Sequence, residues 1–198
     1  MDAPSWIGID YGSKMAGTTV IAAVDAARGV FFAQSKKKND ADQFIVDWIE
    51  EQATPPTLFL DAPLSLPLVY RAPSHGGDYF YRQADKAVQA MSPMFLGGLT
   101  ARAMRLRQQL EALGCTVYEV YPGYLARQWA LKEHGYKKQK QYLQAVVEAL
   151  HPHLPFPLAE APDNWHQVDA LLAFLSGYRF FSNQHQTFGA ADEGYIIV

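Results

Sequence analysis

The sequence is short of cysteine, of basic charge and of long apolar runs. Cys115 is the only cysteine in 198 residues, so an intrachain disulfide is excluded. With no histidine near it in sequence, Cys115 is interpreted as a small buried residue and not as a nucleophile. The formal net charge of −3 argues against strong non-specific coating of DNA, but not against a local basic groove. No apolar run is long enough to cross a bilayer.

The start of the chain also lacks the pattern of a signal peptide. Asp2 is acidic where a signal peptide is basic, and Asp10 interrupts the apolar run that starts at Trp6. We therefore expect a cytoplasmic protein with no membrane partner. Hydrophobic residues make up 49% of the chain and charged residues 19%, which is typical of a globular protein. The length suits one domain, residues 1–198, with a sizeable core.

The apolar pattern predicts an α/β fold that begins with three strands. They are expected at residues 6–10, 18–24 and 30–34, and the short connections between them indicate an antiparallel meander. A helix over 40–52 then leads to a buried strand at 58–61. A connection that runs from strand to helix to strand implies a parallel, right-handed crossover.

The second half of the sequence adds helices and one further strand. A strand at 116–121 completes a mixed five-stranded sheet flanked by helices. Residues 193–198 could be a short strand or an ordered tail. Helices are predicted at 99–113, 138–150 and 163–181, with Asp163 as the cap of the last one, and a short helix is possible at 81–90.

Two of the predicted strands end in the same way, with an apolar run followed by an aspartate. These residues are Asp10 and Asp61. Ligand sites in open α/β sheets lie at the carboxyl ends of strands, so two such carboxylates on neighbouring strands would meet at one edge. They would repel each other unless a cation or a proton lay between them, and oxygen ligands suit Mg²⁺ or Mn²⁺. A single aspartate of this kind could merely cap a turn, but the repetition favours a shared site.

Three further residues are candidates for the same site. Asp169 lies at an otherwise apolar helix start, where a charge is costly unless it is paired or bound to metal. His166 lies three residues earlier on the same helix face, although a lone histidine is often structural. Glu119 lies in the middle of a strand, and a buried carboxylate there needs a partner, so it is a candidate fourth ligand.

The sequence resembles, over almost its whole length, the bacterial and archaeal family of predicted nucleases with an RNase H-like fold. Residues 7–12 look like the first strand of RNase H-like proteins. The other matching segments follow in the family's order: 59–67, 81–85, 99–102, 119–122, 166–170 and 193–196. The resemblance implies an RNase H-like domain with Asp10, Asp61 and Asp169 as its acidic core. Holliday-junction resolvases carry paired acidic residues at the start of the last helix, so His166 would be a metal-binding or proton-transfer variant.

Several basic residues are candidate contacts for a nucleic-acid substrate. Lys14, in the break after the first strand, and Arg82 and Arg102, in family-like segments, are predicted to bind substrate. Arg105 and Arg107 are expected to be solvated. The same is expected of a basic stretch at a helix start, with phosphate binding as the alternative; it comprises Lys132, Lys137, Lys138 and Lys140. Four aromatic residues could stack on bases or pack within a loop: Tyr70, Tyr79, Phe80 and Tyr81.

The favoured function is metal-dependent hydrolysis of phosphodiester bonds in nucleic acid. Two Mg²⁺ or Mn²⁺ ions would be bridged by Asp10, with Asp61, Asp169 and Glu119 completing the ligands, so no protein nucleophile is needed.

Two other functions stay open. The run from Asp10 to Ser13 resembles the phosphate loop of actin-like and sugar-kinase folds, which would indicate ATP-dependent phosphotransfer. A second aspartate–glycine loop is absent, however, because Ala62 and Pro63 follow Asp61. The third function is that of a non-catalytic module that binds nucleic acid or protein.

Overall fold

A computed structural model describes residues 6–198 of the chain; Asp2, on which the signal-peptide expectation depends, lies outside them. Strand β1 (Trp6–Asp10) pairs antiparallel with β2 (Val20–Asp25), and β2 pairs antiparallel with β3 (Gly29–Gln34). The predicted meander is therefore confirmed.

Helix α1 makes the crossover to the next strand, β4. It spans Ala41–Glu50, and the carboxylate of Asp40 accepts hydrogen bonds from the first backbone N–H groups of the helix. Ile45 and Ile49, one turn apart, are buried against the sheet. Strand β4 (Thr57–Asp61) then pairs parallel with β1, as the sequence predicts.

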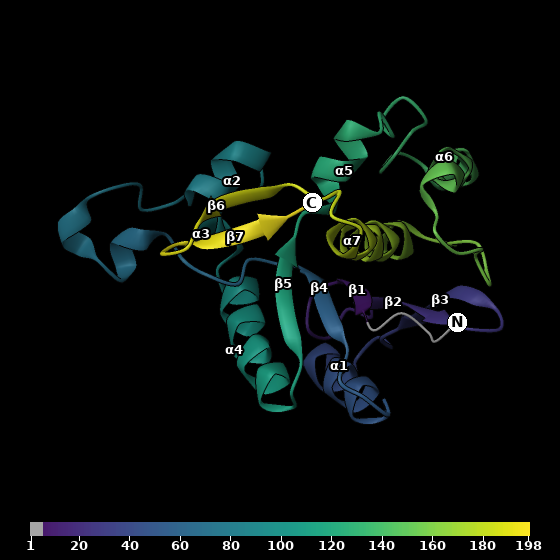
Figure 1. Ribbon diagram of the computed structural model, residues 1–198, viewed down its shortest axis with the longest axis horizontal. Coiled ribbons are helices and arrows are strands. Elements are labelled where there is room, and N and C mark those ends of the chain that lie inside the picture. The colour runs from purple at the N-terminus through teal and green to yellow at the C-terminus, as the bar shows by residue number, and fades with distance from the viewer. Residues whose placement is uncertain (1–5) are drawn as a thin grey trace.

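A long excursion separates β4 from β5 and extends away from the sheet (Figure 1). Helix α4 (Gly98–Ala112) ends it and leads into β5 (Thr116–Val120), which is parallel to β4. The excursion also holds four short helical elements: η1 (Leu68–Tyr70), η2 (Pro73–His75), α2 (Gln83–Val88) and α3 (Pro93–Leu96).

The chain after β5 is mostly helical. It forms α5 (Pro122–Gln128), η3 (Lys140–Tyr142), α6 (Leu143–Leu150), η4 (His151–His153) and α7 (Trp165–Phe181). The predicted helix over 138–150 begins later than expected, because Lys140–Tyr142 form the separate turn η3 and the α-helix starts only at Leu143. Asn164, and not Asp163, caps α7.

The sheet has seven strands, so the prediction of five is wrong. A terminal hairpin of β6 (Thr187–Ala190) and β7 (Gly194–Ile197) adds to it, and the order is β3-β2-β1-β4-β5-β7-β6. Strand β7 pairs parallel with β5 through only Glu119↔Ile196 and Val120↔Ile197. Strand β6 has four residues, none of them buried, so it lacks the buried face by which a strand is recognised in sequence.

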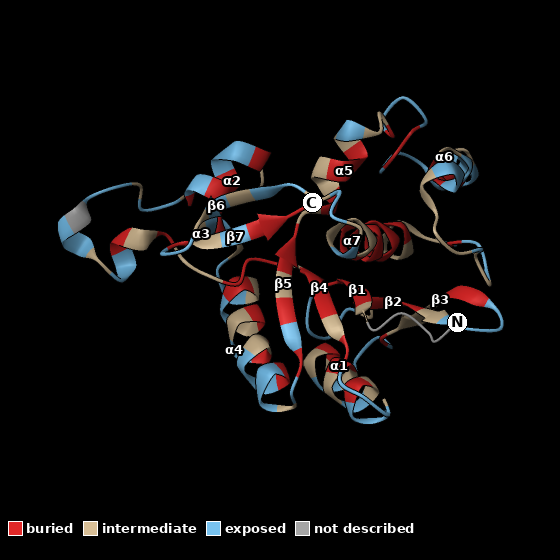
Figure 2. Cartoon of the chain, viewed as in Figure 1, coloured by how far each residue is buried: buried red, intermediate tan, exposed pale blue. Residues whose placement is uncertain are grey.

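Helices cover both faces of the sheet (Figures 1 and 2). Helices α1 and α4 pack on one face, while α5, α6 and α7 cover the other. Helix α7 is buried continuously from Val168 to Gly177 and crosses β1 closely: a Cβ on Gly8 would lie 2.0 Å from the backbone nitrogen of Phe174. This contact sets the position of α7 relative to Asp10. No helix within residues 6–198 is long and apolar enough to span a membrane.

Candidate carboxylate site

Asp10 and Asp61 are register partners at the ends of β1 and β4. The prediction that they lie on adjacent parallel strands is confirmed. Both line a cavity of about 200 Å³, whose apolar wall includes Leu96 and Leu99. The cavity lies at the carboxyl ends of the strands, where α/β sheets place their ligands.

Burial and mutual repulsion make ionisation of these two carboxyl groups unfavourable. Burial, together with the charges of Asp10 and Asp169, raises the pKa of Asp61 well above its usual value. Burial and the charge of Asp169 also raise the pKa of Asp10, against a hydrogen bond with His166 that lowers it. The charge of Asp169 therefore acts on both strand-end carboxyl groups, so Asp169 belongs to the same electrostatic environment.

Asp169 is buried and has a partner on each carboxylate oxygen. The hydroxyl of Tyr136 donates to Oδ1, and the ammonium nitrogen of Lys137 lies 2.8 Å from Oδ2. Lys137 was expected to be solvated at a helix start, so its pairing corrects that interpretation. Neither Tyr136 nor Lys137 is predicted from the sequence as a partner of Asp169. The only signal in the sequence is Gly135, a turn-forming residue directly before them.

His166 lies next to Asp10. Its Nδ1 is 2.8 Å from Oδ2 of Asp10, and its side chain is partly exposed. This hydrogen bond, and the charge of Asp10, raise the pKa of His166 although its partial burial lowers it. The imidazole is placed to orient the Asp10 carboxylate and to exchange protons with water.

The donor chemistry at this edge fits a divalent cation, but the present arrangement is not a formed metal group. Carboxylate oxygens are the ligands that Mg²⁺ and Mn²⁺ prefer, and three carboxylates share one electrostatic environment. Within residues 6–198, however, no three or more His, Cys, Asp or Glu side chains are placed to hold a metal ion. Asp10 pairs with His166, and Asp169 pairs with Lys137.

Glu119, which the sequence offers as a fourth metal ligand, is paired with Arg82 in the structure. Arg82 donates to both of its oxygens, with Nη1 2.7 Å from Oε2 and Nη2 2.5 Å from Oε1. Arg82 is fully buried and also pairs with Asp85. These contacts correct the expectation for Arg82, because a guanidinium enclosed by two carboxylates inside the protein is not available to a substrate phosphate.

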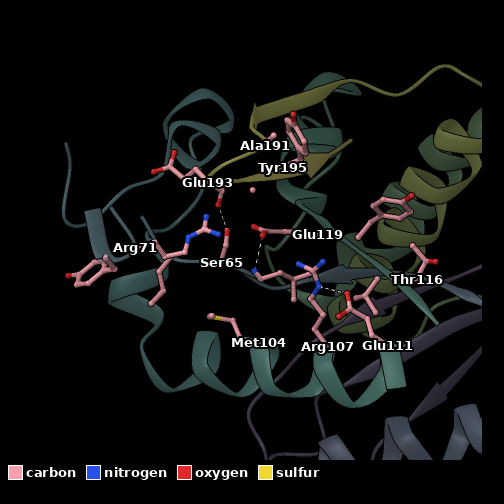
Figure 3. A pocket seen from close by; sticks show the side chains of 16 residues that line it. Ser65, Arg71, Met104, Arg107, Glu111, Thr116, Glu119, Ala191, Glu193 and Tyr195 are labelled. Atoms are coloured by element: carbon pink, nitrogen blue, oxygen red, sulfur yellow. Dashed lines mark hydrogen bonds and ion pairs between the residues drawn. The ribbon is translucent and has the colours of Figure 1, made fainter. Parts of the chain in front are cut away.

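Two glutamates anchor the excursion between β4 and β5 (Figure 3). Oε2 of Glu119 accepts a hydrogen bond from the backbone N–H of Leu64. The carboxylate of Glu193, in the β6–β7 turn, accepts from the backbone N–H groups of Leu68 and Gln83. These contacts hold the excursion against β5 and the β6–β7 turn, and Glu119 also lines the cavity that contains Asp10 and Asp61.

A second cavity of about 580 Å³ lies between α4, the first half of β5 and the β6–β7 turn (Figure 3). Arg71, Arg107 and Glu111 line it, and Arg107 pairs with Glu111 at 2.7 Å. Glu119 lines both cavities, but Asp10 and Asp61 line only the smaller one. The larger cavity is therefore not the carboxylate site.

The other predicted substrate contacts lie near the start of α1. The ammonium of Lys14 is exposed and lies 2.9 Å from Oδ2 of Asp40. Arg102 pairs with Asp42 at 2.6 Å and stacks over the ring of Tyr11. Arg102 is thus engaged by the protein, whereas Lys14 is accessible.

The aromatic residues of the excursion lie partly on the surface. Tyr70, Tyr79 and Phe80 are exposed. They pair with one another or with a neighbour, as Tyr70 does with Tyr79 and Phe80 with Phe95. Base stacking and loop packing thus remain alternative roles for them.

The fold and the site together define an α/β protein with a mixed seven-stranded sheet and a carboxylate pair at the carboxyl ends of two central parallel strands. Comparisons with protein-family models, with curated proteins and with solved structures find no match.

Proposed function

We propose that this protein is a metal-dependent nuclease of RNase H-like fold that hydrolyses phosphodiester bonds. The observation that carries the proposal is the register pairing of Asp10 with Asp61, with Asp169 in the same electrostatic environment. Two carboxylates at one position, with Asp10 buried and Asp61 partly buried, repel each other unless they bind a cation or a proton.

The arrangement of the sheet supports the fold part of the proposal. Strands β1, β2 and β3 form an antiparallel meander, and β4 and β5 follow as parallel strands, which is the five-strand order expected for an RNase H-like domain. The β6–β7 hairpin is then an addition at the β5 edge. Helix α7 packs across β1 and delivers Asp169 and His166 from its first turns.

Asp10, Asp61 and Asp169 would hold the metal. A bound divalent cation supplies an activated water and stabilises the charge on the leaving oxygen. His166 orients the Asp10 carboxylate and can take up or release a proton at the imidazole edge that faces away from Asp10. The apolar residues Leu96 and Leu99 limit water on one side of the cavity. Lys14 is an accessible cation for substrate phosphate.

One observation favours a second candidate, a non-catalytic binding module. Asp169 is paired with Lys137 and Asp10 with His166, so the site can be partly neutralised by the protein alone.

A nuclease screen with Asp10→Asn separates the two candidates. The parent protein is incubated with single-stranded, duplex and branched DNA and with RNA, in Mg²⁺ or Mn²⁺ and in chelator. We expect metal-dependent cleavage of at least one substrate, lost in Asp10→Asn. Asp163→Asn is the matched control, because Asp163 is an exposed residue near the same helix start whose carboxylate accepts from Asn164. Binding of a substrate without cleavage in any metal would favour the binding module.

A further inference from the structure

The turn that carries Tyr136 and Lys137 is a defined structure. The backbone N–H of Tyr136 donates to the carbonyl of Leu131 at 3.0 Å, and that of Lys138 donates to Gly135 at 2.9 Å. The indole N–H of Trp165, the first residue of α7, donates to the Lys138 carbonyl at 2.8 Å. The turn is therefore attached to the helix that carries Asp169.

Lys137 is held in a backbone conformation that its residue type disfavours. Its φ is +58°, in the left-handed region that L residues other than Asn and Asp rarely adopt. Gly135 precedes it with φ +93°, and a Cβ there would lie 2.5 Å from the ring of Tyr142. Such strain persists only where surrounding contacts impose it, and it concentrates at functional sites. At Lys137, the left-handed backbone conformation accompanies a side chain that contacts Asp169.

The Lys137 ammonium lies beside the buried carboxylate of Asp169. It contacts Oδ2 of Asp169 at 2.8 Å, while Tyr136 satisfies Oδ1 with a neutral hydroxyl. Because Asp169 is buried, the ammonium supplies the positive charge that this carboxylate would otherwise lack.

Lys137 is the accessible partner of this ion pair. Its side chain is 54% exposed, whereas that of Asp169 is 6% exposed. If the ion pair breaks, Lys137 can turn into water, but the Asp169 carboxylate stays buried and needs another cation.

We infer that Lys137 is a built-in counter-ion that neutralises Asp169 in the metal-free protein and competes with a divalent cation for it. The inference rests on the proposed metal site and adds a step to it: metal binding must displace the Lys137 ammonium from Asp169.

Mn²⁺ affinity measured by electron paramagnetic resonance tests this without any need for activity. Removing the competing charge in Lys137→Met should tighten Mn²⁺ binding by about tenfold or more. Lys138→Met is the matched control: Lys138 is the neighbouring exposed lysine and faces the ring of Tyr142, so its replacement should leave the affinity unchanged. Asp10→Asn combined with Lys137→Met should lose the tight binding, which assigns the signal to this site.

A second variant and a second measurement control for the possibility that Lys137→Met fails to fold. Lys137→Asn removes the charge, and asparagine tolerates the left-handed backbone, so it should also bind Mn²⁺ more tightly. Thermal melts in chelator and in Mn²⁺ should show a larger metal-induced stabilisation for both Lys137 variants than for Lys138→Met.

The outcomes separate this inference from the proposed function. Mn²⁺ affinity that is equal in the parent, both Lys137 variants and Lys138→Met overturns the counter-ion role and leaves the metal site in place. Weaker binding in the Lys137 variants overturns it as well. Absence of Mn²⁺ binding in every protein overturns both the inference and the proposed metal-dependent function.

Discussion

The imidazole of His166 on α7 and the carboxylate of Asp10 on β1 form a pair, with Nδ1 2.8 Å from Oδ2, although the two residues are 156 positions apart in sequence. The hydrogen bond favours the protonated imidazole, so the pKa of His166 lies above the usual value of about 6.5. A raised histidine pKa stabilises the fold fully at pH below the unfolded value, and this stabilisation is lost as the pH rises through the folded value.

The first prediction concerns that pair. Asp10→Asn should lower the pKa of His166 toward its usual value, because the neutral amide no longer favours the imidazolium. NMR titration of the histidine ring protons in chelator measures the change. His153 is an internal control: burial and the charge of Arg179 lower its pKa, and it should titrate identically in both proteins. An unchanged His166 titration would show that Asp10 does not set its protonation.

The second prediction is that Asp61→Asn stabilises the metal-free protein at neutral pH. Burial and repulsion by Asp10 and Asp169 raise the pKa of Asp61, so its ionised form opposes folding. Its contribution to stability is favourable when protonated and is lost as the pH rises through the folded pKa. We expect a gain of about 0.5–2 kcal/mol, or roughly 2–4 °C in Tm for each kcal/mol.

Thermal melts of the parent and Asp61→Asn in chelator, across a pH series, check this result. The difference between the two proteins should vanish near and below a pH of about 4, where the aspartate is protonated in the folded and unfolded states. A lower Tm for Asp61→Asn at neutral pH would mean that the Asp61 carboxylate has a stabilising partner.

The third prediction tests whether Arg82 is structural. Arg82→Met leaves the buried Glu119 and Asp85 carboxylates without their cation. Removal of one partner from a buried ion pair costs about 3–5 kcal/mol. Arg105→Met is the matched control, because Arg105 is exposed, and it should change stability by less than about 0.5 kcal/mol. Urea denaturation measures both; similar midpoints for the two variants would contradict the structural role.

The fourth prediction concerns the contact that sets α7 against β1. Gly8→Ala places a methyl group 2.0 Å from the backbone nitrogen of Phe174 and 2.5 Å from the carbonyl oxygen of Ala170, so helix and strand must separate. We expect a loss of about 1–3 kcal/mol or more, seen as a lower Tm. Gly98→Ala is the control, since nothing lies within 4 Å of the added Cβ. Equal melting temperatures would show that α7 adjusts without cost.

The sequence alone was sufficient for the central sheet and for one pair of site residues. Alternating or continuous apolar runs mark β1 to β5, because the side-chain period of a strand is recorded directly in the order of residues. The placement of Asp10 beside Asp61 followed from the crossover at α1, since a parallel connection brings the two strand ends to one edge. Local chemistry thus determined these positions.

Only the tertiary structure decided which charges meet. Glu119 pairs with Arg82 and Asp169 with Lys137, and these partners lie 37 and 32 positions apart in sequence, so neither partner could be selected by local pattern. Strand β7 lies within residues 193–198, which the sequence offered as a strand or a tail, whereas β6 was unrecognised because this short edge strand has no buried face. A charged side chain is unfavourable when buried unless it has a partner, and burial is a property of the folded chain. The sequence therefore shows which residues can pair, and packing determines which of them do.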